Sequence, residues 1–517
     1  MRTQSLPSFP LRLWHKAHQW WRWPGANWLI LLALLASTQA IAKVEHHDWI
    51  QLSQDGVQLV TDVKPATAAE LMRNLRLFRS VVERYVPSEE GFKEDLEIIL
   101  FARRRDFARL YKPRHFGAFT LPQLTRTSLV VAPSRDRDSL RKHLFHEYVH
   151  YRVRASIAQS APVWFEEGLA TLLADVKLVT RAQQKAADLP DMSILGAWPG
   201  YPELRSFPLQ QLLAARGVEG FSVNQASAFY TTSHHLVREI LLAQNFDQAA
   251  IDGFVYQQNP TIDVLFDRPV GEVERLLRRS MVRAAPALVT KPLTPLTGEE
   301  PGDESGNVTA LPPAEVLDVL GRTLQSVNPK KAQQLYSRLA VLRPDAAYPL
   351  LGVARALSNQ DDQPAAMQAF RRAEQLEPDA AEVVIARSLL GTRGCTIRRT
   401  DDCMIAWRAA VKDLRRGLFE EPDRFDAIYR LGQAHLFLGQ PGEAVNYLAI
   451  AAQRAPWSAR VNYFLGEAYR LLGDSRARVH LERAARWADA AYIQASAEAA
   501  LAELTATNKP PTVGDAR

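Results

Sequence analysis

Residues 146–150 read His-Glu-Tyr-Val-His, and residues 167–170, after a gap of sixteen, read Glu-Gly-Leu-Ala; these two segments decide the fold of the first half of this chain. On a helix, His146 and His150 stand one turn apart on the same face, so both imidazoles can reach one metal ion. A helix is expected because residues 139–145 are helix formers and apolar residues, and apolar side chains continue on the other faces of the segment. The alternative is a helix that carries two solvated histidines.

Glu167 is the candidate for a third ligand. A second helix is expected to begin near Pro162, because proline is favoured in the first turn of a helix, and a short turn between the two helices would bring Glu167 to the same ion. Zinc held by three protein ligands keeps a fourth position for a water molecule, whose pKa it lowers to about 7. Glu147 lies beside both histidines, so we expect it to take the proton of this water and to pass it to a leaving amine.

The two segments together resemble the gluzincin metallopeptidases, the clan of thermolysin-like and aminopeptidase-like enzymes, in which H-E-x-x-H is followed by W-x-x-E-G-x-A. The resemblance implies that His146, His150 and Glu167 bind Zn²⁺ and that Glu147 is the general base. It also implies an α+β zincin-like catalytic domain, with a mixed sheet and active-site helices, over residues 43–284.

Two neighbours of the third ligand bear on this resemblance. Thr171 stands one turn after it, where thermolysin has an aspartate, so the group that orients the histidines stays open. Glu166 is one residue off and should point about 100° away, so we expect a neighbour of the site and not a ligand. Residues 96–101 and 127–132 read as buried strands. In gluzincins a sheet lies there, and its edge strand binds extended substrate by strand addition.

Peptide hydrolysis also needs a donor for the developing oxyanion, because the loss of one such donor typically costs ~10²–10³ in rate. Related peptidases use a tyrosine or a histidine downstream of the third ligand. Tyr230 is the candidate in this chain, and His234 is the second choice. The alternative is that Tyr230 packs a helix and that its hydroxyl contacts water.

The first 42 residues have the features of a secretory signal peptide. Residues 1–27 hold four basic residues and no acidic one, residues 28–36 are apolar, and Ala-Ile-Ala at 40–42 forms a cleavage site. The apolar run is shorter than the ~20 residues that a membrane-spanning helix needs. We therefore expect an exported protein, in the bacterial periplasm or secreted. The alternative is an uncleaved segment that anchors the protein in the membrane.

Charge and composition exclude some classes of protein. The net charge is +6, and four of these charges leave with residues 1–42, so the rest of the chain carries only +2. This charge is too small to argue for nucleic-acid binding, and the sequence has no basic stripe with interleaved aromatic residues. With 47% hydrophobic residues the chain is globular. Its length predicts roughly three units of ~150 residues.

The second half of the chain differs in pattern from the first. Residues 285–313 are rich in proline, with an acidic, Gly-rich middle, and read as a linker that cannot bury enough apolar surface to fold. Residues 314–505 are expected to form a helical repeat domain, and residues 506–517 a disordered tail.

The repeat has a period of 34 residues. Prolines at 344 and 378, prolines at 422 and 456, and the pair Gly432 and Gly466 are each 34 residues apart. This pattern resembles the tetratricopeptide repeat, whose small residues let two helices pack closely and whose proline ends the second helix. We expect an all-α tetratricopeptide-type solenoid of four to five helical hairpins. The alternative is an irregular helical bundle.

The chain has two cysteines, Cys395 and Cys403, and both fall where the gap between two prolines is ten residues too long. An exported compartment allows them to pair. We expect a disulfide that staples an enlarged turn between the two helices of one repeat. A metal site is disfavoured because two thiolates at this spacing lack further ligands.

The sequence therefore predicts an exported, zinc-dependent metallopeptidase of gluzincin type. Its repeats would recruit a peptide or protein substrate or a protein partner, since such solenoids present a concave binding surface. Zn²⁺ is the expected cofactor, and a membrane is a partner only if the N-terminal segment stays uncleaved. One alternative is a catalytically silent envelope scaffold that binds proteins through its repeats. Another is the hydrolysis of a different amide, such as a cell-wall cross-link.

Overall fold

A computed structural model of the chain describes residues 44–86, 94–111, 117–122, 126–134, 136–156, 161–179, 192–195, 206–218, 220–243, 261–282, 288–292, 307–395, 400–488 and 490–507. The predicted signal peptide and most of the predicted tail lie outside these ranges. Asp48–Arg517 form one compact unit. Within the described ranges, every helix is too short or too polar to cross a membrane.

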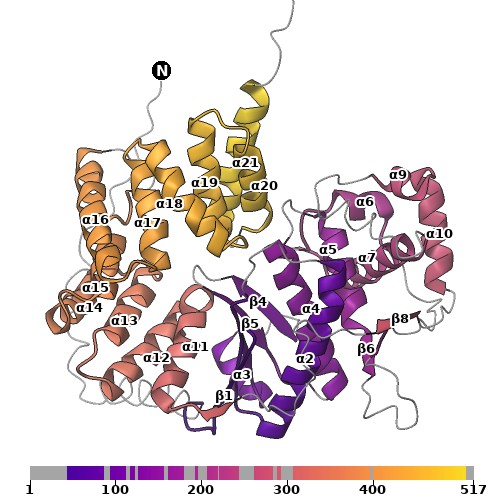
Figure 1. Cartoon of the computed structure of the whole chain (residues 1–517), viewed down its shortest axis with the longest axis horizontal. Coiled ribbons are helices and arrows are strands. Elements are labelled where there is room, and N and C mark those ends of the chain that lie inside the picture. Colours follow the sequence, from indigo (N-terminus) through magenta and orange to yellow (C-terminus); the bar gives the residue numbers. More distant parts are fainter. Residues whose placement is uncertain are drawn as a thin grey trace, which may run out of the picture. The chain divides into compact units, whose positions relative to one another are not determined.

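A six-stranded mixed sheet is the centre of the first half of the molecule (Figure 1). Its strands follow the order β4-β5-β3-β2-β1-β9; their bounds are β1 Ile50–Gln54, β2 Val57–Thr61, β3 Leu96–Leu100, β4 Ala118–Pro122, β5 Thr127–Val131 and β9 Val308–Ala310. Strands β2, β3 and β5 run parallel, and the other three pair antiparallel with their neighbours. The two strands that the sequence predicts, β3 and β5, are buried along their whole length. Such burial is typical of parallel strands that are covered on both faces.

Helices supply much of the core of the first half. Their bounds are α2 Pro65–Tyr85, α3 Arg104–Leu110, α4 Arg137–Ser156, α5 Val163–Ala174, α6 Leu209–Ala214, α7 Val223–Ala243, α9 Ile262–Phe266 and α10 Val270–Val282. Two of them, α2 and α4, pack on the large sheet. Phe78 of α2 stacks on Phe145 of α4 with ring centroids 3.8 Å apart, and both side chains are fully buried. The apolar residues that the sequence places on the non-ligand faces of α4 are therefore core residues.

Gly168 of α5 lies where this helix packs closely against α7. A Cβ atom at this position would lie 2.4 Å from the backbone oxygen of Ser233 and 2.6 Å from a methyl group of Val237. Only glycine lets the two helices pack at this distance. The Glu-Gly pair of the motif thus serves two purposes, because the residue after the third ligand also fixes where α7 lies.

The predicted linker is more ordered than its composition suggested. Two strands lie in it: β8, Leu288–Pro292, and β9, which pairs with β1 at the edge of the large sheet. Strand β8 belongs to a second, three-stranded antiparallel sheet of order β6-β7-β8, with β6 at Val176–Val179 and β7 at Met192–Leu195. The prediction of an unfolded linker over residues 285–313 is therefore wrong for these two segments. Strands β1 and β7 supply the pairing that the segment itself does not encode.

The second half is an all-α solenoid, as the sequence predicts. Consecutive helices form five hairpins and a final helix (Figure 1), with bounds α11 Pro313–Val327, α12 Pro329–Leu342, α13 Tyr348–Ser358, α14 Gln363–Leu376, α15 Ala381–Gly391, α16 Asp401–Glu420, α17 Phe425–Phe437, α18 Pro441–Arg454, α19 Ala459–Leu471, α20 Ala477–Arg486 and α21 Ala491–Thr507. The four prolines of the 34-residue pattern each stand two positions after the end of α12, α14, α16 or α18. They end the second helix of a hairpin, as expected.

Small residues allow the two helices of a hairpin to approach. A Cβ atom on Gly432 of α17 would lie 2.5 Å from Cγ of Leu448 in α18, and one on Gly466 of α19 would lie 2.8 Å from Cγ of Leu481 in α20. The two glycines that define the period therefore occupy equivalent helix crossings. The periodic solenoid is confirmed, and the irregular bundle is wrong.

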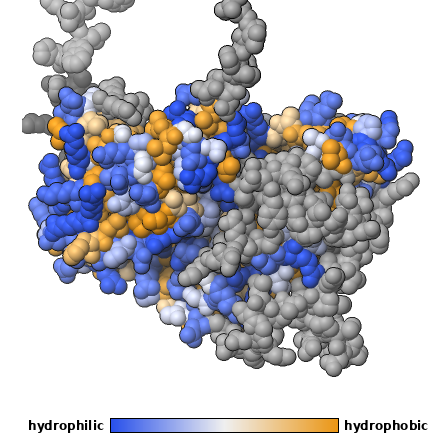
Figure 2. Space-filling model, turned by 45° about the horizontal axis from the view of Figure 1, so that its top comes forward, coloured by the Kyte–Doolittle hydropathy of each residue, from blue (hydrophilic) through white to orange (hydrophobic). Residues whose placement is uncertain are grey.

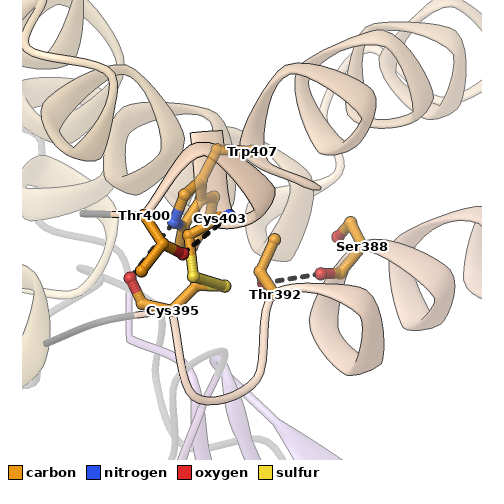
Figure 3. The surroundings of a disulfide bond; sticks show 6 residues. All are labelled: Ser388, Thr392, Cys395, Thr400, Cys403 and Trp407. Atoms are coloured by element: carbon orange, nitrogen blue, oxygen red, sulfur yellow. Dashed lines mark hydrogen bonds between the residues drawn. A yellow bond between two sulfur atoms is a disulfide. The ribbon is translucent and has the colours of Figure 1, made fainter. Parts of the chain in front are cut away.

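The two cysteines form the predicted disulfide between α15 and α16, with Cα atoms 5.2 Å apart (Figure 3). Thr400 caps α16, because its hydroxyl accepts a hydrogen bond from the backbone N–H of Cys403. The indole N–H of Trp407 donates to the backbone oxygen of Cys395. The disulfide thus closes the long turn onto the first turns of α16.

The solenoid begins against the sheet. The hydroxyls of Tyr111, after α3, and Thr323 of α11 lie 2.6 Å apart in a buried hydrogen bond. Arg322 of α11 lies 3.2 Å from the buried carboxylate of Glu97 on β3. The first hairpin is therefore tied to the sheet by polar contacts and not only by the chain connection.

Candidate metal centre

Helices α4 and α5 bring the three predicted ligands together. The Nε2 atoms of His146 and His150, on consecutive turns of α4, lie 3.1 Å apart. The Oε2 atom of Glu167, on α5, lies 3.4 Å from the first and 3.3 Å from the second. Helix α4 is capped by Asp136, which accepts a hydrogen bond from the backbone N–H of Ser139. Helix α5 begins directly after Pro162, as the sequence predicts.

These distances fit a tetrahedral zinc ion. Zn–N and Zn–O bonds of ~2.0–2.2 Å at tetrahedral angles place two ligand atoms about 3.3–3.5 Å apart. The three atoms of His146, His150 and Glu167 converge with almost these separations. The donor set also fits, because two imidazole nitrogens and one carboxylate oxygen are ligands that zinc prefers in catalytic sites. The buried Oε2 of Glu167 accepts no hydrogen bond from the described residues.

The charges around the ligands favour a cation. Burial opposes the protonated form of His150, but the carboxylates of Glu167 and Glu166 outweigh it and raise the pKa of His150 to about 10. Burial likewise opposes the ionised form of Glu167, yet His150 and His146 lower the pKa of Glu167 to about 2. The site thus stabilises one positive charge, which a proton or a metal ion can supply.

Access to the three ligands is uneven. The side chain of His146 is 24% exposed, whereas that of His150 is 8% exposed. The open side of the centre is therefore the side of His146. The side of His150 is closed by protein.

The predicted general base lies on the sheet side of the ligands. The Oε2 atom of Glu147 accepts a hydrogen bond of 2.7 Å from the hydroxyl of Thr120 on β4, the edge strand of the large sheet. One carboxylate oxygen of Glu147 is thus held by the sheet. No sequence signal marks Thr120, since β4 is a short segment with no motif of its own.

Glu166 has a role that the sequence did not reveal. Its Oε1 atom lies 2.8 Å from Nδ1 of His150 and 3.3 Å from Nε of Arg154. A carboxylate on the second ring nitrogen fixes the tautomer and the orientation of a ligand histidine. Burial opposes its charge, but Arg154 and His150 hold the pKa of Glu166 well below its usual range. Glu166 is a neighbour of the ligands, as expected, and it takes the place left open by Thr171.

Helix α7 brings the ring of Tyr230 near the imidazole of His146. The ring centroids of Tyr230 and His146 are 6.4 Å apart. His234, the second choice, is buried one turn further along α7. Burial lowers the pKa of His234 to about 4, and the charges that act on it are those of Asp175 and Arg238 rather than those of the ligands. The geometry therefore favours Tyr230 over His234.

Comparisons with known proteins reach only one part of the chain. No model of a protein family matches the sequence, and no curated protein matches it. Among solved structures, similar chains include TTC0263, a thermophilic TPR protein of Thermus thermophilus, at 16% identity and a TM-score of 0.32 over 37% of this chain and 99% of that one. Two others are Pseudomonas aeruginosa pilF (14%, TM-score 0.28, 38% and 91%) and YrrB, a TPR protein with an unusual peptide-binding site (17%, TM-score 0.24, 36% and 92%).

The repeat solenoid and the small mixed sheet are thus established by the structure itself, through the helix pairs and the strand order. The zincin-like fold stays a prediction from the motif.

Proposed function

We propose that this protein is a zinc-dependent metallopeptidase with a helical repeat domain that binds a protein substrate or partner. The observation that carries the proposal is the convergence of His146, His150 and Glu167 at tetrahedral spacing. Glu147 follows His146 directly in the sequence. The sequence motif places the two histidines on one helix, but it does not by itself bring Glu167 of a second helix to them. The charge balance of the site, which favours a cation, supports the same conclusion.

A zinc ion held by the three ligands would polarise a substrate carbonyl and lower the pKa of water to about 7. The residues of the chain do the rest. Glu147, which Thr120 holds through one carboxylate oxygen, takes the proton of the attacking water and then passes it to the leaving amine. The hydroxyl of Tyr230, whose ring centroid lies 6.4 Å from that of His146, donates to the oxyanion that develops on the carbonyl.

The repeats support a binding role. Large apolar side chains are exposed on their helices, and they include Phe419 of α16 at 84% and Ile405 of the same helix at 62%. Figure 2 shows hydrophobic residues between hydrophilic ones on the face turned to the viewer. Exposed apolar surface with a polar surround is typical of sites that bind other proteins.

We also propose that the protein is exported, to the periplasm or out of the cell, with membrane anchoring as the alternative. The basic, apolar and Ala-x-Ala segments of residues 1–42 support this. The disulfide between Cys395 and Cys403 supports it as well, because disulfides persist mainly in oxidising compartments.

The alternative function is a catalytically silent envelope scaffold that binds proteins through its repeats. The repeat solenoid is the established part of the molecule, and taken alone it supports binding and no chemistry.

A cleavage assay separates the two functions. The full chain, reconstituted with zinc, is incubated with a mixture of synthetic peptides of varied sequence, and the products are identified by mass spectrometry. The proposal expects new peptide termini with the wild type and none with Glu147→Gln at equal zinc content. Cleavage by neither protein, together with a partner captured by the repeats, would favour the scaffold.

A further inference from the structure

The last complete hairpin of the solenoid reaches the metal centre. Nη2 of Arg486, the final residue of α20, lies 3.3 Å from Oε2 of Glu166 on α5. The two residues are 320 positions apart in the sequence, and the Arg486 side chain is only 15% exposed. A half-buried arginine of the repeat domain therefore contacts the carboxylate that holds His150.

The two oxygens of Glu166 have separate partners. Oε1 faces Nδ1 of His150 and Nε of Arg154, whereas Oε2 faces Arg486. A carboxylate held at both oxygens cannot rotate about its terminal bond without losing one partner. Its hydrogen bond to His150 then keeps the imidazole plane fixed, with Nε2 directed at the ligand point.

This contact belongs to a larger packed region. Trp457, in the turn between α18 and α19, is buried against Ala155 at the carboxyl end of α4. Its ring centroid lies 6.2 Å from that of Tyr151, also on α4. The repeat domain therefore packs against α4, the helix that carries both histidines, on the carboxyl-terminal side of His150. Arg486 lies within a packed interface. The loss of one partner of an ion pair costs more free energy there than at an exposed surface.

We propose that Arg486 of the repeat domain is a positioning residue of the metal centre, which fixes Glu166 so that Glu166 fixes the ligand His150. The inference rests on the proposed function, since it takes the ion at the centre to be zinc. It makes the repeat domain a structural part of the metal site as well as a binding surface.

The physical consequence is a loss of metal affinity when Arg486 is removed. The Oε2 atom of Glu166 would lose its cationic partner while still buried, which is costly for a charged group. The carboxylate would turn towards Arg154 or towards water, and its hydrogen bond to His150 would weaken. Loss of such outer partners typically reduces metal affinity by about 10–100-fold.

The test is a measurement of zinc affinity on the full chain, by competition with a chromophoric chelator. Arg486→Met keeps the length and apolar stem of the side chain but removes the charge. Arg478→Met is the matched control, because Arg478 lies on the same helix and is 46% exposed. The expected result is a dissociation constant about tenfold higher for Arg486→Met and unchanged for Arg478→Met. Equal affinities of wild type and Arg486→Met would overturn the inference.

A double-mutant cycle separates positioning from a merely structural role. Glu166→Gln should weaken zinc binding by itself, and Arg486→Met should then add less than about a twofold effect, because the residue through which it acts is already changed. A full further loss in the Glu166→Gln background would mean that Arg486 only holds the domains together, and the inference would be wrong.

Two further outcomes are distinguishable. A wild type that binds no zinc overturns the proposed function and the inference with it, whereas zinc binding that Arg486→Met leaves intact overturns the inference alone.

If Arg486→Met lacks the circular dichroism spectrum of the wild type, Arg486→Lys replaces it. Lysine keeps the charge but lacks the planar fork of arginine. A zinc affinity between those of the wild type and Glu166→Gln supports the inference, and an unchanged affinity contradicts it.

Discussion

Contacts in the solenoid join residues that are near each other in the sequence, whereas some contacts around the candidate metal centre join residues that are far apart in it. In the solenoid, Gly432 packs on Leu448 and Gly466 packs on Leu481, so each contact joins two consecutive helices. At the metal centre the three ligands come from two consecutive helices, but their supporting groups come from β4, α7 and α20. Substitutions in the solenoid should therefore have local effects, whereas the centre should respond to changes far from its ligands.

The largest effect is expected for Glu147→Gln. This residue lies at the centre without being a ligand, so the proton transfer is lost and the ligands are kept. Hydrolysis should fall by ~10²–10⁴-fold. Peptide cleavage rates and zinc content are measured on the same preparation. A variant that loses its zinc instead would show that Glu147 holds the metal and would contradict the assigned roles.

Tyr230→Phe should have the next largest effect on the reaction. It removes the hydroxyl of Tyr230 and leaves in place the ring, whose centroid lies 6.4 Å from that of His146. We expect kcat to fall by about 10²-fold with little change in KM, because an oxyanion donor acts in the transition state. Steady-state kinetics on one good peptide substrate measure both constants. Unchanged turnover would reduce Tyr230 to a packing residue.

Substitution of glycine by alanine compares the two regions directly. At Gly168 the new Cβ meets the backbone oxygen of Ser233, which cannot move without α7, whereas at Gly432 it first meets the side chain of Leu448. We expect a loss of about 3 kcal/mol in the free energy of unfolding at Gly168 and about 1 kcal/mol at Gly432. Only the first variant should also lower hydrolysis, through Tyr230.

The control for these variants is Gly271→Ala on α10, where nothing lies within 4 Å of the new Cβ. It should be neutral or slightly stabilising, since alanine is the better helix former. Denaturant unfolding followed by circular dichroism gives all three values. Equal losses at Gly168 and Gly432 would contradict the difference between a rigid and an adaptable neighbour.

Removal of the disulfide should affect the solenoid alone. The double variant Cys395→Ser, Cys403→Ser opens a short loop and should lose about 2 kcal/mol of stability. Its zinc affinity should match that of the wild type, because the turn between α15 and α16 is remote from α20 in the sequence of hairpins. Calorimetry and chelator competition measure the two quantities. A drop in zinc affinity would mean that strain passes along the solenoid to Arg486.

The smallest effect is a dependence of stability on pH at His480 of α20. Burial, helped by the charges of Arg483 and Arg476, lowers the pKa of His480 to about 4, whereas an unfolded histidine titrates near ~6.5. The unfolded chain thus binds more protons between these values. The contribution of His480 is complete above pH ~6.5 and is lost as the pH falls to ~4. His480→Gln should flatten this part of the stability profile, and parallel profiles would contradict the assignment.

The convergence of the three candidate ligands could be predicted from the sequence because each belongs to a short, local pattern. One helical turn relates His146 to His150, and the Glu-Gly pair marks the third ligand together with a close helix crossing at Gly168. The solenoid was predictable for a similar reason, since its period repeats the same contact. Strands β3 and β5 were predictable from apolar runs in the sequence, and helices α4 and α5 from the helix signals around the motif residues.

The supporting groups could not be predicted, because tertiary packing alone places them. Nothing in the sequence relates Arg486 to Glu166 across 320 residues, or marks Thr120 as a neighbour of Glu147. Strand β9 was missed for the same reason. Its three residues are all exposed, and they form a strand because β1 offers a free edge.

The central claim, a three-ligand zinc site, is tested most directly by the zinc content of the purified full chain and of Glu167→Ala, measured by mass spectrometry of the metal. The account predicts about one zinc per chain in the wild type and a sharp drop in the variant, whose third ligand is gone. A wild type that holds no zinc even after reconstitution would contradict the account and leave the repeats as the working part of the protein.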